Sequence, residues 1–240
     1  AANDKGTVTI TGALSLAGNT TIETNTAGSQ TLDGDITVTG TTNATGSETL
    51  TINSGSGAVD FGGLIGGTDG LGDVAINTTA GTTGNLSTGT IAIVGIGSAD
   101  GTTMSGTDDG STFTAGNTNT TLITLDGDMY FTDGDTLFEA ASGNTIDNAG
   151  ATAAVTYYKT DGNTLEFKGG TLYIQDATTG INIATGGGAV TINSIDGDHD
   201  ETVTINAGAG AVSVGRIGGS NALSSPCLLY TSDAADDSLR

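Results

Sequence analysis

Residues 181–197, INIATGGGAVTINSIDG, and residues 203–219, VTINAGAGAVSVGRIGG, decide the fold. The two stretches align without a gap at an offset of 22 residues. Six aliphatic positions coincide: Ile181, Ile183, Ala189, Val190, Ile192 and Ile195 with Val203, Ile205, Ala211, Val212, Val214 and Ile217. A more distant copy at 48–71, ETLTINSGSGAVDFGGLIGGTDGL, shares 14 of 23 aligned residues with 201–223. Such self-similarity at a short period predicts a repeat architecture.

Each unit contains short strands in which aliphatic and polar residues alternate, as in Val8-Thr9-Ile10 and Leu50-Thr51-Ile52. Alternation at a period of two puts the aliphatic side chains on one face of a strand, and Gly-rich clusters supply turns with positive φ. One unit has too few aliphatic residues for a core of its own, so the units must stack.

We therefore predict an all-β parallel β-solenoid, a right-handed β-helix with about 18–22 residues per coil. The lower figure comes from Thr31-Leu32 and Thr49-Leu50, which lie 18 residues apart. Ten or eleven coils, roughly 4.8 Å apart, would form a rod on the order of 50 Å long. Tandem β-sandwich modules are the main rival, but they need about 100 residues each.

The Gly- and Thr-rich texture ends near Pro226. The next residues, CLLYTSDAADD at 227–237, resemble the in-frame translation of a transposase-type sequencing adapter at the end of a metagenomic gene sequence. We therefore expect residues 1–225 to be a single solenoid domain from a longer protein, and residues 226–240 to be a disordered artefact. The chain's only Cys, Cys227, lies in that tail, so the solenoid offers no thiol chemistry.

Charge excludes one class of partner. The chain has 5 Lys and Arg against 27 Asp and Glu, a formal net charge of −22. Nucleic-acid binding needs a basic surface that displaces counterions from phosphates, so no nucleic-acid partner is expected. No stretch of the sequence approaches the roughly 18 apolar residues of a membrane span.

Asp-Gly-Asp recurs four times, and carboxylates on turns suit Ca²⁺, which takes about six to eight oxygen ligands. The candidate ligands are Asp196, Asp198 and Asp200, and also Asp126, Asp128, Asp133 and Asp135; the fourth pair is Asp33 and Asp35. The stretch 196–201 opens like an EF-hand loop, but Glu201 replaces the turn glycine and Ala207 replaces the bidentate Glu. These turns are predicted either to be solvated or to bind calcium weakly, and no other cofactor is expected.

Seven of the ten Phe and Tyr residues fall in the middle of the chain: Phe113, Tyr130, Phe131, Phe138, Tyr157, Tyr158 and Phe167. They predict either a wider coil filled by larger side chains or an exposed strip that stacks on sugar rings. Tyr157 and Tyr158 are the candidates for glycan stacking. Because they are adjacent, they point to opposite faces of a strand.

Right-handed β-helices also include lyases and glycosidases that act on pectin. A uronate lyase needs cations beside the substrate carboxylates, and the chain before the tail has only Lys5, Lys159, Lys168 and Arg216. A glycosidase needs two placed carboxylates, and no pair stands out in the sequence. The sole histidine, His199, accompanies no nucleophile motif. We therefore expect no catalytic residue.

The segments GAVDFGGLIGGTDGLGDVAIN (57–77) and GAVSVGRIGGSNALSS (210–225) resemble the degenerate Gly-rich repeats of filamentous-haemagglutinin-like and autotransporter-passenger adhesins. The resemblance covers about half of the chain. It implies secretion across an outer membrane, folding at the bacterial cell surface, and host or neighbouring-cell glycans or proteins as partners.

The sequence thus predicts a non-catalytic structural or adhesive stalk segment of a large secreted bacterial surface protein. Two alternatives stay open. One is a carbohydrate-active β-helix enzyme of glycosidase or lyase type. The other is a calcium-dependent surface-layer or matrix protein.

Overall fold

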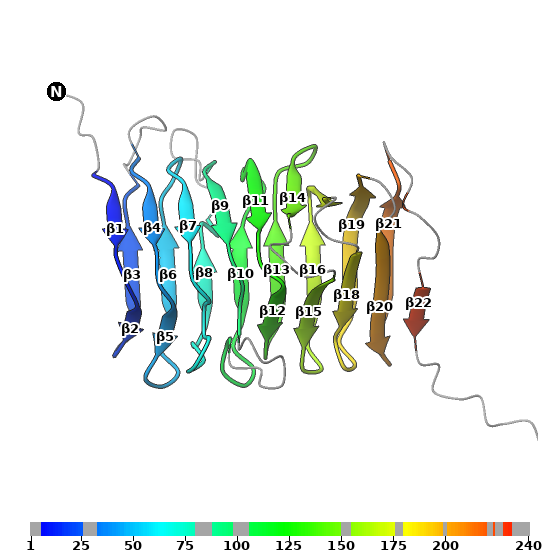
Figure 1. The fold of residues 1–240 in the computed structure, drawn as a ribbon, viewed down its shortest axis with the longest axis horizontal. Helices are drawn as coiled ribbons and strands as arrows, with labels where there is room; N and C mark the ends of the chain where they lie inside the picture. Colours follow the sequence, from blue (N-terminus) through cyan, green and yellow to red (C-terminus); the bar gives the residue numbers. More distant parts are fainter. Residues whose placement is uncertain are drawn as a thin grey trace, which may run out of the picture.

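The structure is a computed structural model of the chain. It describes residues 6–25, 33–79, 88–97, 106–149, 155–175, 180–198, 201–219, 223 and 228–231. These residues form 22 β-strands and no helix, and the strands follow one another along a single long axis (Figure 1). The predicted all-β parallel solenoid is confirmed, with about seven turns.

Three faces make up the solenoid, and each coil contributes to all three. The first face contains β1 (Val8–Ile10), β4 (Ile36–Val38), β7 (Val59–Phe61), β9 (Thr90–Ile93), β11 (Leu122–Leu125), β14 (Thr145–Asn148) and β17 (Thr171–Ile174). The second contains β2 (Leu14–Leu16), β5 (Thr42–Ala44), β12 (Met129–Thr132), β15 (Thr156–Thr160), β18 (Gly180–Ala184), β20 (Thr202–Gly208) and β22 (Leu228–Thr231). The third contains β3 (Thr20–Glu23), β6 (Leu50–Asn53), β8 (Val74–Ile76), β10 (Phe113–Gly116), β13 (Thr136–Glu139) and β16 (Leu165–Lys168).

Two long strands turn a corner between faces. In β19 (Val190–Gly197), Val190 pairs with β16 on the third face and Ile195 pairs with β17 on the first. β21 (Val212–Ile217) stacks on β19 through both parts. On the second face, single bridges through Ile65 and Ile96 connect β5 to β12. The ladder is therefore continuous on every face.

Strand register confirms the 22-residue offset where the sequence showed it most clearly. Ile181 pairs with Val203, and Ile192 pairs with Val214, in adjacent coils. Elsewhere the coil is longer, about 25 residues on average, because turns carry insertions: Val74 pairs with Phe113, 39 residues later. The predicted ten or eleven coils therefore reduce to about seven turns, a stack of roughly 35 Å.

The 18-residue spacing is not a coil length. Leu50 pairs with Thr20, 30 residues earlier, and Leu32 lies outside the described residues. The distant repeats also occupy different faces. Leu50 lies on the third face, whereas its aligned counterpart Val203 lies on the second. The unit shared by these distant segments is therefore two strands with the corner between them, β6 and β7 against β20 and β21, and not a whole coil.

The corners reuse one turn, which explains why this unit can move between faces. A hydroxyl group at the first position donates a hydrogen bond to the carbonyl oxygen three residues later. This occurs from Ser54 to Gly57 (2.6 Å), from Thr160 to Asn163 (2.5 Å) and from Thr185 to Gly188 (2.5 Å). The side chain thus satisfies a corner carbonyl that the strand ladders leave free.

The core is a set of columns in which each inward side chain packs on its equivalents in the coils before and after. The middle coils widen the core with aromatic rings. Phe138 lies between Phe113 and Phe167, with ring centroids 5.8 and 5.4 Å away, and Tyr130 stacks on Tyr158 at 5.0 Å. Of the two predictions for the aromatic residues, the structure supports the filled coil for these five.

The tail expected to be a disordered artefact is described only at 228–231. There the backbone forms β22, which pairs in parallel with β20 through Ile205 and Leu229. The other residues of 226–240 lie outside the described residues. Among the described residues there is no helix long and apolar enough to cross a lipid bilayer.

Candidate functional site

Several acidic side chains expected on solvated turns connect one coil to the next. Asp135 directly precedes β13, and its Oδ1 accepts hydrogen bonds from the backbone N–H (2.9 Å) and the hydroxyl (2.7 Å) of Thr164, directly before β16. Asp73 does the same for Thr112 (2.8 and 3.0 Å), and Asp35 accepts the N–H of Ala58 at 2.8 Å. An Asp before a strand therefore caps the equivalent position of the following coil.

Capping changes the titration of the carboxyl group. The two hydrogen bonds from Thr164 lower the pKa of Asp135 below its ordinary value, because they stabilise the ionised form. Asp33 has a related contact, since its Oδ2 accepts from the N–H and the hydroxyl of Ser56 at 2.8 and 3.0 Å. In these Asp-Gly-Asp segments the carboxylates therefore have a structural role that the sequence did not reveal.

A groove at the corner between the second and third faces gathers further acids. Its volume is about 360 Å³, and it crosses four coils; the lining residues are Thr45, Gly46, Thr68, Asp69, Gly70, Thr107, Asp108, Asp109 and Asp133. Asp133 is fixed in the groove because its backbone N–H donates to Thr107 Oγ1 at 2.8 Å. Partial burial raises the pKa of Asp133, and the charges of Asp109, Asp161 and Asp108 raise it further.

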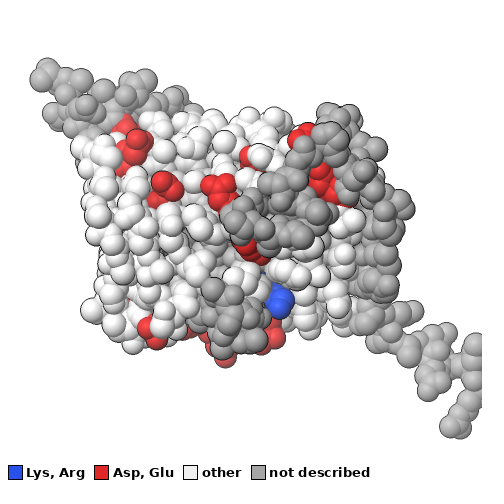
Figure 2. Space-filling view, viewed as in Figure 1, with Lys and Arg blue, Asp and Glu red and all other residues white. Residues whose placement is uncertain are grey.

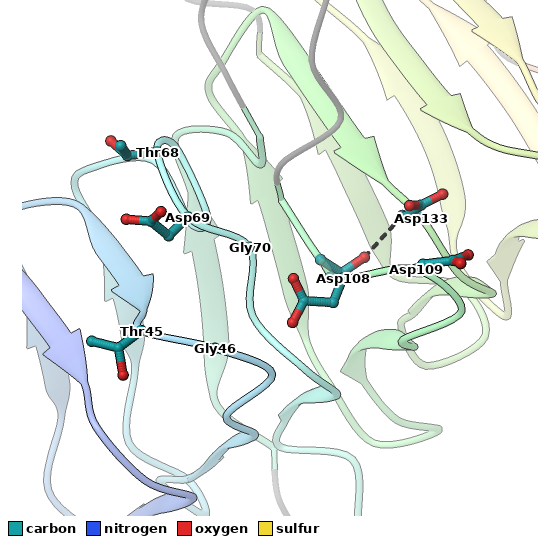
Figure 3. Close-up of a pocket in the computed structure, with 9 residues that line it drawn as sticks. Thr45, Gly46, Thr68, Asp69, Gly70, Asp108, Asp109 and Asp133 are labelled. Carbon is teal, nitrogen blue, oxygen red and sulfur yellow. Dashed lines mark hydrogen bonds between the residues drawn. The ribbon is translucent and has the colours of Figure 1, made fainter.

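The groove carboxylates do not converge. Figure 3 shows the side chains of Asp69 and Asp108 pointing to the left of the view and those of Asp109 and Asp133 pointing to the right. Within the described part of the chain, no three His, Cys, Asp or Glu side chains are arranged to hold a metal ion.

The strongest sequence candidate for calcium is only partly described. Asp200 and His199 lie outside the described residues. Asp196 is largely buried, and its Oδ1 accepts the N–H of Gly197 at 3.1 Å. Asp198 accepts a hydrogen bond from the Tyr173 hydroxyl at 2.9 Å, and this bond raises the pKa of Tyr173. Calcium binding at these residues stays a prediction.

Asp126 and Asp128 flank Gly127 in the turn between β11 and β12. The N–H of Gly127 donates to the hydroxyl of buried Tyr130 at 2.8 Å, and that hydroxyl donates to the carbonyl oxygen of Ile93 at 3.0 Å. Burial raises the pKa of Tyr130, and the charges of both acids add to the effect. This pair therefore surrounds a core tyrosine, and calcium binding there also stays a prediction.

The two glycan-stacking candidates separate as their adjacency requires. Tyr158 is 1% exposed, and its hydroxyl donates to Asn148 Oδ1 at 2.5 Å inside the core. A sugar cannot reach this ring, so the Tyr158 candidate is not supported. Tyr157 is 39% exposed on the outer side of β15, in register with Met129 and Asn182. It is the surface aromatic ring among the described candidates.

The described basic side chains all have contacts within the chain. Lys168 Nζ lies 3.1 Å from Glu139 Oε1, Lys159 Nζ lies 4.9 Å from the ring centroid of Phe131, and Arg216 donates to the carbonyl oxygen of Gly219 at 2.9 Å. Lys5 lies outside the described residues. In the view of Figure 2, acidic side chains are spread over the described surface and are not gathered in one patch.

Sequence reasoning missed three of the four groove acids. Asp69, Asp108 and Asp109 are far from Asp133 in the sequence, and only stacking of the coils brings them to one corner. The available signal was an Asp-Gly turn at equivalent positions of successive coils, and the variable coil length concealed it.

Comparisons with known proteins add no relative. The chain matches no protein-family model, and searches of curated proteins and of solved structures each return no match. The resemblance to adhesin repeats therefore stays a prediction from repeat texture.

Proposed function

We propose that this chain is a non-catalytic structural and adhesive stalk segment of a large secreted bacterial surface protein. The observation that supports the proposal most directly is the role of the acidic side chains before strands. Asp35, Asp73 and Asp135 each hydrogen-bond the backbone of the following coil. These carboxylates, which in another arrangement could act in catalysis or bind a cation, instead connect neighbouring coils.

The packing also suits a load-bearing rod. Backbone hydrogen bonds between coils run along the axis on all three faces, and the inward columns add apolar contacts between the same coils. Each coil contacts only its neighbours, so stability is close to a sum of coil and interface contributions. A rod of this kind holds a binding region away from the cell surface, and under tension its coils unfold one at a time.

The adhesive part of the proposal rests on Tyr157. Its ring is exposed on the second face, between the uncharged side chains of Met129 and Asn182. A flat ring beside an amide suits a sugar, which has an apolar face and hydroxyl groups. With a net charge of −22, the chain repels polyanions, so a neutral glycan is the favoured partner.

Single-molecule force spectroscopy tests the stalk. Handles at the two ends should give successive ruptures, each releasing about 25 residues, or roughly 80 Å of chain. One rupture that releases the whole chain would contradict the stalk.

Non-catalysis is tested separately, by incubating the protein with neutral and acidic polysaccharides and measuring new reducing ends. Release of reducing ends would favour the enzyme alternative.

Binding of the protein to a panel of neutral glycans tests the adhesive part. Tyr157→Ala should abolish binding, whereas Asp60→Ala, an exposed substitution on the first face, should leave it unchanged. Retained binding by Tyr157→Ala would remove this ring from the proposal without affecting the stalk.

A further inference from the structure

Asp-Gly dipeptides are frequent in this chain, and they have a specific chemical liability. The backbone nitrogen of the Gly can attack the side-chain carboxyl carbon of the Asp, because Gly lacks a Cβ and its backbone rotates freely. The structure describes seven such dipeptides, which begin at Asp33, Asp69, Asp109, Asp126, Asp133, Asp161 and Asp196. Asp100-Gly101 lies outside the described residues. The fold decides which of the seven can react.

Three of the seven have the glycine N–H engaged in a hydrogen bond to another part of the chain, which holds the attacking nitrogen in place. Gly110 donates to the carbonyl oxygen of Asp133, Gly127 to the Tyr130 hydroxyl and Gly162 to the carbonyl oxygen of Thr185, each at 2.8 Å. In these three dipeptides the attack requires breaking a native contact first. In Asp196-Gly197 the glycine N–H donates to the carboxylate of Asp196 itself (3.1 Å), and the restraint comes from burial of Asp196 and from the pairing of Gly197 with Ile174 in the sheet.

Asp33-Gly34 is held from the carboxylate side. Ser56 donates both its N–H and its hydroxyl to Asp33 Oδ2. The buried Gly34 accepts a hydrogen bond from the Thr24 hydroxyl at 2.5 Å. The carboxyl carbon therefore cannot swing toward the Gly34 nitrogen without losing these contacts.

Asp133-Gly134 is held by its backbone. The N–H of Asp133 donates to Thr107 Oγ1 at 2.8 Å, and its carbonyl oxygen accepts from Gly110 N–H at 2.8 Å and from Asn163 Nδ2 at 3.0 Å. Gly134 packs so closely on the preceding coil that a Cβ on it would lie 1.9 Å from the carbonyl oxygen of Ser111. The peptide between Asp133 and Gly134 cannot rotate into the geometry of attack.

Asp69-Gly70 has none of these restraints. Asp69 is exposed at the rim of the corner groove (Figure 3), and within the described structure neither its carboxylate nor the N–H of Gly70 makes a hydrogen bond. The backbone restraints lie on either side of the reacting peptide. Before it, the N–H groups of Thr68 and Asp69 donate to Asn43 Oδ1 at 3.0 and 3.4 Å, and after it the N–H of Leu71 donates to the carbonyl oxygen of Gly106 at 3.3 Å. Here the nucleophile, the carboxyl carbon and the peptide between them are all free to move.

We propose that Asp69 is a site of spontaneous isomerisation to isoaspartate in the folded protein. The Gly70 nitrogen forms a bond to the carboxyl carbon of protonated Asp69. The nitrogen loses its proton, the carbon–oxygen bond of the carboxyl group breaks, and one water leaves. The product is a five-membered succinimide. One water then opens the ring at either carbonyl carbon, and opening at the backbone carbonyl carbon leaves the main chain running through the side-chain carbon.

The modification changes the wall of the groove. Isoaspartate lengthens the main chain by one carbon just before Leu71, whose N–H donates to the carbonyl oxygen of Gly106 and whose carbonyl oxygen accepts from Asp108 N–H at 2.6 Å. Leu71 also pairs with Thr107 of the next coil. The altered turn therefore lies beside residues that line the groove, and the new side-chain carboxylate is a substrate for isoaspartyl carboxyl methyltransferases.

The experiment follows isomerisation of the full chain during prolonged incubation at mildly acidic pH, below the melting temperature. Peptide mapping by mass spectrometry, with methyl labelling by an isoaspartyl methyltransferase, measures each Asp-Gly site. We expect Asp69 to isomerise at least about tenfold faster than Asp109, Asp126, Asp133 or Asp161, because those sites react only after local opening. Asp100-Gly101 is measured in the same maps.

Three comparisons make the result decisive. Asp69→Glu keeps the charge but would need a six-membered ring, so the signal at this site should disappear. Gly70→Ala should slow isomerisation at Asp69 severalfold, because a Cβ at residue 70 hinders attack by the backbone nitrogen. In denaturant, all described Asp-Gly sites should react at similar rates. Equal rates in the folded protein, or faster reaction at Asp133 than at Asp69, would overturn the proposal.

Discussion

Asp135 and Thr164 lie at equivalent positions of adjacent coils, and one carboxylate oxygen accepts both the backbone N–H and the hydroxyl of the threonine. Asp135→Ala removes both hydrogen bonds. We expect a loss of about 1–2 kcal/mol in the free energy of unfolding. This loss is small for two hydrogen bonds to a charged group, because solvent screens the charge at this exposed site. Urea unfolding measures the change.

Asp60→Ala is the matched control, because Asp60 is exposed on β7 and makes no described side-chain hydrogen bond. It should change the free energy of unfolding by less than about 0.5 kcal/mol. The Asp135 contribution should also depend on pH. Its folded pKa is lowered, so the contribution is present above the ordinary value of 3.8 and is lost as pH falls through the folded pKa. Equal losses for the two variants would refute the capping role.

Asp133 should show the opposite pH dependence. Its folded pKa is raised above 3.8, so folding takes up protons in this range and stability increases as pH falls from neutral toward 3.8. Asp133→Asn removes the charge that Asp108, Asp109 and Asp161 repel. We expect the melting temperature of this variant to be about 1–2 °C higher at neutral pH. The further rise in melting temperature as the pH falls toward 3.8 should be smaller than in the unmodified protein. A variant with an unchanged pH profile would mean that the groove charges do not interact.

The fold was predictable from the sequence because inward positions keep their aliphatic character even where coils differ in length. The pairs Ile181–Val203 and Ile192–Val214 stack as predicted. Coil length was less predictable, since insertions such as the one between Val74 and Phe113 fall in turns, where neither burial nor hydrogen bonding fixes the number of residues.

The candidate site was predictable only in part. Asp133 stood out within an Asp-Gly-Asp motif, but its groove neighbours come from other coils. Adjacency of Tyr157 and Tyr158 predicted opposite faces, yet nothing local decides which one faces the core. That choice follows from stacking, since Tyr158 pairs with Tyr130 and Ile183 in one inward column.

Calcium provides a test of the acidic turns. Because Asp35, Asp73 and Asp135 already hydrogen-bond neighbouring coils, we expect calcium to act on stability mainly by screening repulsion within a chain of charge −22. Melting temperatures in calcium and sodium chloride should then agree within about 1 °C at matched ionic strength. A rise of several degrees that is specific to calcium and reversed by a chelator would favour the calcium-dependent alternative.

The hydroxyl group of Thr42 is buried without a hydrogen-bond partner in the described structure. The side chain is 0% exposed. Thr42→Val keeps the shape and removes the unsatisfied group, so it should stabilise the protein by about 1 kcal/mol. Thr136→Val is the matched control, because the buried Thr136 hydroxyl contacts that of Thr132 and donates to the carbonyl oxygen of Gly134 at 3.2 Å. The two identical substitutions should have opposite signs, and matching signs would contradict the assignment.

Asn77 combines a left-handed backbone with a buried polar contact. Its φ is 49°, its side chain accepts from Ser54 N–H and donates to Ser54 Oγ, both at 2.8 Å, and its carbonyl oxygen accepts from Asn117 Nδ2 at 2.5 Å. Asn tolerates positive φ better than most residues. Asn77→Ala loses both side-chain bonds and strains the backbone, so we expect a destabilisation of about 2–4 kcal/mol.

Asn77→Gly separates the two contributions. It loses the same hydrogen bonds to Ser54 but adopts positive φ without strain, so it should be more stable than Asn77→Ala by roughly 1 kcal/mol. Denaturant unfolding of the two variants beside the unmodified protein gives both differences. A glycine variant less stable than the alanine variant would contradict the backbone contribution. The stabilising effect of Asn77 would then come entirely from its hydrogen bonds to Ser54 in the preceding coil.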